Sequence, residues 1–160
     1  MSATMPVGAD RLVALANAVG ADALITDPAE LAYYGQDVFS VGAPLLAVFR
    51  PADKHALARG VGAATAQGIA VVPRGGGMSY TGGYLASAPG ALLIDLGSMN
   101  RVLDINTTDM TVTVEAGCTW AQLRQALLPH APFIASMFQT LREKRDGSMR
   151  ADFFLDLLRQ

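Results

Sequence analysis

Five glycines within nine residues are the most unusual feature of this 160-residue chain. Residues 75–77 are consecutive glycines, and Gly82 and Gly83 follow shortly after. Residues without a Cβ adopt positive φ readily, so successive backbone N–H groups can point towards one place and form a concave anion site. A diphosphate could approach such a loop closely. A tight strand exit or a loop without a ligand would need the same glycines, so the spacing alone leaves both interpretations open.

Side chains beside the glycines could strengthen an anion site. Arg74 could add positive charge, and the hydroxyls of Ser79 and Thr81 could donate hydrogen bonds. Hydrogen bonds to a charged oxygen contribute roughly 1.5–3 kcal/mol each. The P-loop motif is absent, because Gly83 and Tyr84 follow Gly82 where Lys and Ser or Thr are required.

The dinucleotide-binding fingerprint of the Rossmann fold is absent as well. Gly75 and Gly77 would require a third glycine at position 80, which is Tyr80, and no helical pattern follows the loop. The sequence therefore indicates neither nucleotide hydrolysis nor an ordinary Rossmann site.

The segments around the loop predict a βαβ unit. Residues 45–49 and 69–72 are short apolar runs typical of buried parallel strands, and Asp53 can cap a helix that reaches Gln67 between them. The glycine-rich segment then leaves the carboxyl end of the second strand, which is where ligands bind in α/β architecture.

Further elements are expected on both sides of this unit. The pattern predicts a helix over 10–19, a short helix after Asp27, a strand over 91–96, a hairpin of 101–105 with 111–115, and a helix that begins with the capping box Thr119–Gln122 and ends at Pro129.

Composition excludes several classes of function. A single cysteine cannot form an internal disulfide, and one cysteine with two histidines cannot supply the four ligands of a structural zinc site. A formal net charge of −2 without a basic cluster disfavours nucleic-acid binding. No apolar run approaches the roughly 18 residues of a membrane span, and no secretory signal begins the chain, so we expect a cytoplasmic location.

Three ordered segments resemble one family of flavoproteins. They are VVPRGGGMSYTGG at 71–83, LLIDLGSMNRV at 92–102 and VTVEAGCTWAQL at 112–123. Together they resemble the FAD-linked oxidases of the vanillyl-alcohol oxidase and p-cresol methylhydroxylase family, and within it glycolate oxidase flavoprotein subunits and D-lactate dehydrogenases. The resemblance implies an α+β FAD-binding domain of the p-cresol methylhydroxylase type, with an N-terminal βαβ subdomain and the start of a second subdomain.

The same resemblance implies which residues bind the cofactor. The expected FAD-binding residues are Pro73, Arg74, Gly75, Gly76, Gly77, Met78, Ser79, Gly82 and Gly83. Met78 stands where some members carry a histidine bonded to the flavin, and a thioether cannot replace that nucleophile, so we expect noncovalent FAD. Catalytic residues cannot be assigned, and no metal ligands are expected.

The resemblance divides the chain into three parts: a helical lead-in over 1–40, an incomplete FAD-binding domain over 41–130, and an atypical tail over 131–160. Fifteen of sixteen glycines precede the tail, which holds five of the twelve Lys and Arg residues. Family members continue with further strands and a substrate domain, so the chain is interpreted as a truncated or frameshifted member that lacks a substrate site.

Two hypotheses about function follow, beside a third possibility that the glycine loop binds some other diphosphate. In the first, the chain is the FAD-binding part of an oxidoreductase that oxidises a 2-hydroxy acid such as glycolate or D-lactate when complete. In the second, it is a non-catalytic remnant or a module that needs another chain. Substrate, electron acceptor and homo- or hetero-oligomeric state are left open.

The remaining polar candidates have ordinary structural explanations. His55 is expected on a solvated helix face, and His130 follows Pro129 where the resemblance ends. Cys118 is expected to be packed, and Asp95 and Glu115 to serve in turns or caps.

Overall fold

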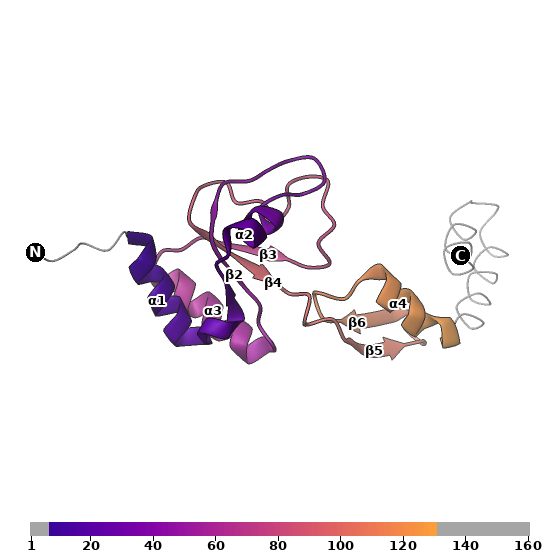
Figure 1. Ribbon diagram of the computed structural model, residues 1–160. Coiled ribbons are helices and arrows are strands. Elements are labelled where there is room, and N and C mark those ends of the chain that lie inside the picture. Colours follow the sequence, from indigo (N-terminus) through magenta and orange to yellow (C-terminus); the bar gives the residue numbers. More distant parts are fainter. Residues whose placement is uncertain (1–6, 131–160) are drawn as a thin grey trace, which may run out of the picture.

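A four-stranded sheet lies at the centre of the computed structural model, which describes residues 7–130 (Figure 1). Its strands are β1 (Leu24–Ile25), β2 (Leu45–Phe49), β3 (Val71–Arg74) and β4 (Ala91–Asp95). Their order across the sheet is β1-β2-β4-β3. β2, β4 and β3 run parallel, and β1 pairs antiparallel to β2.

The predicted strand–helix–strand unit is present, with one shift in its second strand. β3 begins at Val71 rather than at Ile69, because the Ile69 N–H donates to the Ala64 carbonyl at the end of the helix. Ile69 is nevertheless buried. β4 lies between β2 and β3, and all five of its residues are buried, as its continuous apolar run predicts.

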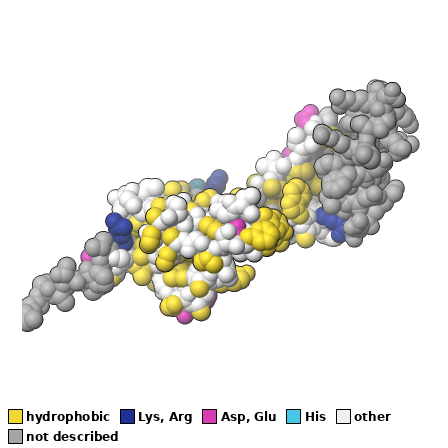
Figure 2. Space-filling view, turned by 90° about the horizontal axis from the view of Figure 1, so that it is seen from above, with side chains coloured by type: hydrophobic (Ala, Val, Ile, Leu, Met, Phe, Trp, Pro, Cys, Tyr) yellow, Lys and Arg dark blue, Asp and Glu magenta, His cyan; other side chains and the backbone are white. Residues whose placement is uncertain are grey.

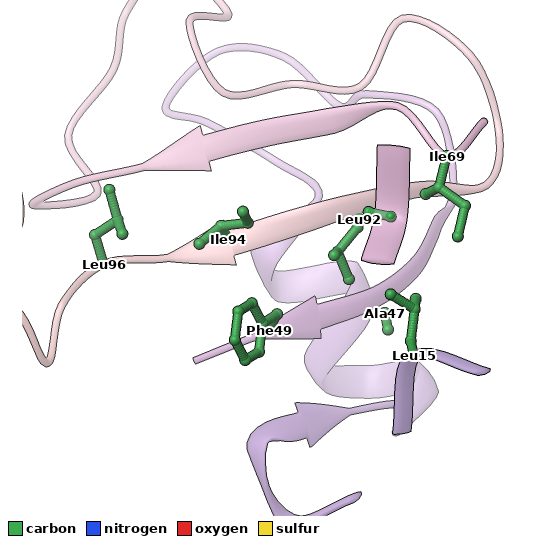
Figure 3. Close-up of a cluster of buried hydrophobic side chains, with 8 residues drawn as sticks. Leu15, Ala47, Phe49, Ile69, Leu92, Ile94 and Leu96 are labelled. Carbon is green, nitrogen blue, oxygen red and sulfur yellow. The ribbon is translucent and has the colours of Figure 1, made fainter. Parts of the chain in front are cut away.

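Two helices cover one face of the sheet. α3 (Lys54–Ala66) begins at Asp53, whose carboxylate accepts hydrogen bonds from the His55 and Ala56 N–H groups, both at 2.8 Å. α1 (Val7–Val19) packs against it, and η1 (Ala21–Ala23) leads from α1 into β1. The buried side chains between helices and sheet form one cluster (Figure 3): Leu15, Ala47, Phe49, Ala64, Ile69, Leu92, Ile94 and Leu96.

The other face of the sheet is covered by α2 (Pro28–Tyr34) and by part of the loop between β3 and β4. Asp27 caps α2 as predicted, accepting from the Ala29 and Glu30 N–H groups. The buried side chains on this face are Tyr34, Val48, Tyr84 and Leu93. Because side chains alternate along a strand, Val48 faces this cluster while Ala47 and Phe49 face the helices.

A hairpin and a helix follow the sheet. They are β5 (Val102–Asn106), β6 (Thr111–Val114) and α4 (Trp120–Leu127), after which η2 (Leu128–His130) ends the described part. Both hydrogen bonds of the predicted capping box at Thr119 and Gln122 are present. None of the residues in these elements is fully buried.

Hydrophobic side chains are exposed on the surface of the described part, as Figure 2 shows for one face. Trp120 at the start of α4 is 80% exposed. Among the helices between residues 7 and 130, none has the length and apolar character needed to cross a membrane.

Candidate functional site

The glycine-rich segment is the first half of the connection from the end of β3 to the start of β4, which spans residues 75–90. Within the described residues, no hydrogen bond is donated by the backbone N–H groups of 75–80. The ends of this run are anchored through carbonyls: that of Arg74 accepts from the Leu96 N–H at 2.9 Å, and that of Ser79 accepts from the Val38 N–H at 3.5 Å. The loop thus presents consecutive donors that the described part of the fold leaves free.

Gly77 lies at the turning point of this run. It has φ +78°, and a Cβ there would lie 2.5 Å from an Nη atom of Arg74. The Tyr84 hydroxyl donates to the Gly77 carbonyl at 3.2 Å. Because C=O and N–H point in opposite directions in a trans peptide, that contact turns the Met78 N–H away from Tyr84 and the core.

Gly76 has no structural reason to be glycine. It is exposed, its φ lies outside the left-handed region, and a Cβ would meet nothing nearer than Thr119 Cγ2 at 3.7 Å. The neighbouring Gly75 differs, because its Cβ would lie 2.7 Å from the Ala116 carbonyl oxygen. A glycine without an internal cause, beside free amides, fits the close approach of a diphosphate to the main chain.

The second half of the glycine loop is held by side-chain acceptors. The Gly82 N–H donates to Asp37 at 2.8 Å, and the N–H groups of Thr81 and Gly83 donate to the Ser79 hydroxyl oxygen at 3.3 and 3.1 Å. The Ser79 hydroxyl thus organises the turn, and the Thr81, Gly82 and Gly83 amides are already engaged within the fold.

Asp37 is a site residue that the sequence analysis missed. Its other carboxylate oxygen accepts from the Phe39 and Ser40 N–H groups at 2.9 and 2.7 Å. These backbone hydrogen bonds, from Phe39 above all, lower the pKa of Asp37 below its ordinary value. An Asp three residues before a Ser is an Asx-turn signal, but no pattern connects residue 37 to residue 82.

A row of charged residues closes the carboxyl edge of the sheet. Arg50, Asp95 and Arg74 occupy adjacent positions at the ends of β2, β4 and β3. Asp95 lies 3.3 Å from Arg50 Nε and 3.8 Å from Arg74 Nη1. It also accepts from the Tyr34 hydroxyl at 3.0 Å and from the Gly97 N–H at 3.1 Å. The expected turn role of Asp95 is therefore accompanied by two ion pairs.

Arg74 does not extend into solvent. Its side chain is 15% exposed, and its guanidinium carbon lies 4.9 Å from the ring centre of Tyr34 and 5.3 Å from that of Tyr84. Arg74 therefore lies beneath the glycine loop, not on its outer side. Sequence reasoning considered Tyr34 only as a packing residue and did not connect Tyr34, Tyr84 or Arg50 to Arg74, because only the tertiary fold brings them together.

Exposed apolar side chains border the loop. Met78 is 72% exposed and Tyr80 60% exposed, and the ring of Tyr80 lies 5.7 Å from that of Phe39. Pro73, another predicted site residue, is the exposed third residue of β3. The nine predicted residues thus lie in one continuous stretch that the fold brings to the carboxyl edge of the sheet.

The other polar candidates lie outside this stretch. His55 is exposed near the start of α3, and Cys118 is half-buried. Glu115 pairs with Arg101 at 2.7 Å, which lowers the pKa of Glu115. Among residues 7–130 no group of three or more His, Cys, Asp or Glu side chains could hold a metal ion. The predicted tail over 131–160 lies outside the described residues.

Comparison with known proteins adds independent findings. A family model described as an FAD binding domain matches residues 45–142. A D-2-hydroxyglutarate dehydrogenase of Xanthomonas citri pv. viticola is 41% identical over 108 residues, which is 67% of this chain and 23% of that protein. A mitochondrial D-lactate dehydrogenase (cytochrome) of Kluyveromyces lactis is 33% identical over 64 residues, or 39% of this chain and 11% of that protein. The chain thus spans a quarter or less of these relatives.

Solved structures share the fold. p-Cresol methylhydroxylase with substrate bound has a TM-score of 0.64 at 18% identity, and the match covers 79% of this chain and 25% of that one. The 4-ethylphenol oxidase of Gulosibacter chungangensis has a TM-score of 0.69 at 25% identity, with the same two coverages. The expected α+β architecture of the p-cresol methylhydroxylase type is therefore confirmed for part of such a domain.

Proposed function

The chain belongs to the family of FAD-binding domains of FAD-linked oxidoreductases, and from this premise we propose that the loop over 73–83 binds FAD noncovalently through its main chain. The observation that carries the proposal is the run of free backbone N–H groups over 75–80, with Gly76 left unexplained by the fold. The diphosphate of FAD needs several converging donors, and main-chain amides supply them without a flexible side chain.

The predicted residues divide into three roles under this proposal. The amides of Gly75, Gly76, Gly77 and Met78 face the diphosphate. Pro73 and Arg74 deliver the chain from β3 into the loop. Ser79, Gly82 and Gly83 set the return of the loop, because the Ser79 hydroxyl accepts from the Gly83 N–H.

Noncovalent attachment is supported by the chemistry of residue 78. Met78 is exposed beside the free amides, and its thioether offers no nucleophile comparable to imidazole. Bound FAD is released on denaturation if this is correct. Flavin that remains with acid-precipitated protein would contradict noncovalent binding.

The proposed reaction of the complete enzyme is oxidation of a 2-hydroxy acid. FAD supplies the acceptor for a hydride from the substrate carbon, while the protein contributes binding and orientation. The support is the similarity to proteins named as D-2-hydroxyglutarate and D-lactate dehydrogenases. Because this chain spans 23% of the Xanthomonas protein and 11% of the Kluyveromyces protein, we assign no catalytic residue within it.

The decisive experiment uses the purified 160-residue chain with and without FAD. We expect a flavin absorbance spectrum, shifted from that of free FAD, that stays with the protein through gel filtration. Titration with FAD gives the dissociation constant, and assays with D-2-hydroxyglutarate, D-lactate and glycolate in the presence of an electron-accepting dye test turnover. A chain that stays colourless at saturating FAD would contradict the proposal.

A second candidate function is an FAD-binding module that works only with another chain. It is favoured by the hairpin β5–β6 and helix α4, which contain no fully buried residue and so leave surface for another chain to cover. Flavin binding without turnover of any of the three acids would support it. A cytoplasmic location, the oligomeric state and the interpretation of 131–160 as an atypical tail stay predictions.

A further inference from the structure

We infer that Arg74, Tyr84 and Asp95 are positioning residues that hold the glycine loop from beneath, so that its free amides converge on the diphosphate while Arg74 contributes its charge through the loop. This inference rests on the proposed binding of FAD and goes beyond it, because it gives the side chains under the loop a part in affinity. None of the three needs to touch the ligand.

The charged row of Arg50, Asp95 and Arg74 arises from the order of the strands. Parallel strands in the order β2-β4-β3 end at one edge of the sheet, so Arg50, Asp95 and Arg74 become neighbours although Asp95 lies 45 and 21 residues from the two arginines along the chain. One carboxylate therefore lies between two guanidinium groups. The row thus contains one more basic than acidic side chain.

Two of the three charged side chains in this row are largely buried. The side chains of Asp95 and Arg74 are 10% and 15% exposed, whereas that of Arg50 is 47% exposed. Charges under a loop interact with an anion above it more strongly when less water separates them. The less exposed guanidinium, that of Arg74, is thus the one whose charge acts on the loop.

The guanidinium group of Arg74 is in contact with the glycine loop. A Cβ on Gly77 would lie 2.5 Å from one Nη atom and 2.7 Å from the guanidinium carbon, so the guanidinium group lies directly against the turn. Tyr34 and Tyr84 hold the same group through their ring faces. The Nε atom of Arg74 is buried and lacks a hydrogen-bond partner among the described residues, so packing against rings and backbone supplements the Asp95 ion pair in holding the side chain.

The Tyr84 hydroxyl sets the orientation of the peptide between Gly77 and Met78. The Tyr84 hydroxyl holds the Gly77 carbonyl inward at 3.2 Å, and the Met78 N–H consequently points outward. Without that hydroxyl the peptide between residues 77 and 78 can rotate about ψ of Gly77, because a residue without a Cβ restricts its backbone little. The loop would then lose one converging donor without losing any buried hydrophobic side chain.

The test compares Tyr84→Phe and Arg74→Met with wild type, using three probes: FAD, ADP and riboflavin. FAD and ADP carry a diphosphate, and riboflavin carries no phosphate. We expect Arg74→Met to weaken the binding of FAD and ADP about tenfold or more, and Tyr84→Phe to weaken it severalfold. The affinity for riboflavin should stay unchanged in both variants. Arg74→Lys, which keeps the charge but not the planar group, should lie between wild type and Arg74→Met.

Two further readouts separate positioning from stability. The FAD affinity of wild type should fall with ionic strength more steeply than that of Arg74→Met, since a charge takes part only in the former. The amide NMR signals of 75–80 should shift in ligand-free Tyr84→Phe while signals of β2 stay in place. Asp95→Asn and Arg74→Met both disturb the ion pair between residues 74 and 95 and can impair folding, so Tyr84→Phe and Arg74→Lys keep the inference testable if Arg74→Met does not fold.

The outcomes distinguish the two proposals. A wild-type chain that binds FAD, together with folded Arg74→Met and Tyr84→Phe variants of equal affinity, overturns this inference and leaves the proposed function standing. A wild-type chain that binds no FAD overturns both. Equal weakening of riboflavin and FAD would also overturn the inference, because the support acts on the diphosphate.

Discussion

Gly76 and Gly77 are adjacent, but the fold makes different demands on them. Gly77 needs a positive φ and space for Arg74, so a side chain there strains the structure itself. Gly76 is exposed, with room for a Cβ, so any cost of a side chain arises from a ligand. This difference allows the binding role of the loop to be tested apart from its folding.

The Gly76→Ala variant should fold as well as wild type and bind FAD more weakly. We expect a free energy of unfolding within about 0.5 kcal/mol of wild type, since the site is exposed. The FAD dissociation constant should rise about tenfold, because a methyl group would stand between the amides and the diphosphate. Isothermal calorimetry and thermal denaturation measure the two effects.

Gly90→Ala is the matched control. Gly90 has φ +88°, a Cβ there would have no atom within 4 Å, and the residue lies at the far end of the same connection. That variant should lose stability through backbone strain while the folded protein keeps its FAD affinity. Unchanged FAD affinity in Gly76→Ala would count against the proposed diphosphate site.

Protonation of Asp37 at low pH should loosen the glycine loop at Gly82. Its pKa is lower in the folded chain than in the unfolded chain, so its stabilising effect is complete above the unfolded pKa and is lost as pH falls through the folded value. Protonation removes an acceptor from the Gly82 N–H. We therefore expect the amide of Gly82 to keep its protection through the ordinary range of an Asp carboxyl, about pH 4, and to lose it only at lower pH.

Asp37→Asn should reproduce this loss at neutral pH. The amide nitrogen of Asn cannot accept a hydrogen bond, so one carboxylate oxygen of Asp37 has no substitute while the other can still serve Phe39 and Ser40. The measurement is NMR hydrogen exchange of the Gly82 amide from acidic to neutral pH, expressed relative to the intrinsic rate of an unstructured chain. Exchange at Gly82 that is the same in variant and wild type would contradict the link.

At the scale of elements, α3 packs closely against β2 because Gly60 has no side chain. A Cβ on Gly60 would lie 2.2 Å from Phe49 Cε1, so the ring fills the space that glycine leaves on the helix. Gly62, two residues further along the same helix, has nothing within 4 Å of such a Cβ. The two glycines therefore differ in packing although both lie inside α3.

Alanine at these two positions should change stability in opposite directions. Gly60→Ala should destabilise the fold by about 1–3 kcal/mol through overpacking against Phe49. Gly62→Ala should stabilise it by roughly 0.5–1 kcal/mol, because alanine loses less backbone entropy in a helix. Urea denaturation of both variants measures the difference, and a stabilised Gly60→Ala would show that Phe49 does not pack as described.

Over the whole molecule, burial is uneven between the sheet and the hairpin. β4 is buried throughout, whereas β5, β6 and α4 contain no fully buried residue. A two-stranded hairpin with little buried apolar surface is marginally stable in water. Met99, in the connection between β4 and β5, accepts a hydrogen bond from the Gly117 N–H at 2.9 Å.

Hydrogen exchange of the purified chain should report this unevenness. Amides of β5 and β6 should exchange through local opening, at least about tenfold faster than those of β2 and β4, which require global unfolding. FAD should slow exchange most in 75–80, where the free amides gain an acceptor. Equal protection of hairpin and central strands would indicate that another surface, such as a second copy, covers the hairpin.

Local patterns in the sequence were sufficient to predict many features. The caps at Asp27, Asp53 and Thr119 depend on neighbours within three residues. The apolar run of β4 predicts a buried strand without any knowledge of the strand order, and β4 is buried. The glycine spacing predicted a loop at the carboxyl end of a strand, and the structure has one there. The three segments that resemble flavoprotein oxidases led to the family that the comparison confirms.

Only the tertiary structure placed β4 between β2 and β3, and that placement decides what lies beneath the loop. It brings Asp95 between Arg50 and Arg74, adds Tyr34 from α2, and connects Asp37 to Gly82 across 45 residues. Local spacing carries no information about strand order, because pairing between distant segments depends on the packing of the entire core. The loop was thus predictable from its residues, whereas its support required the fold.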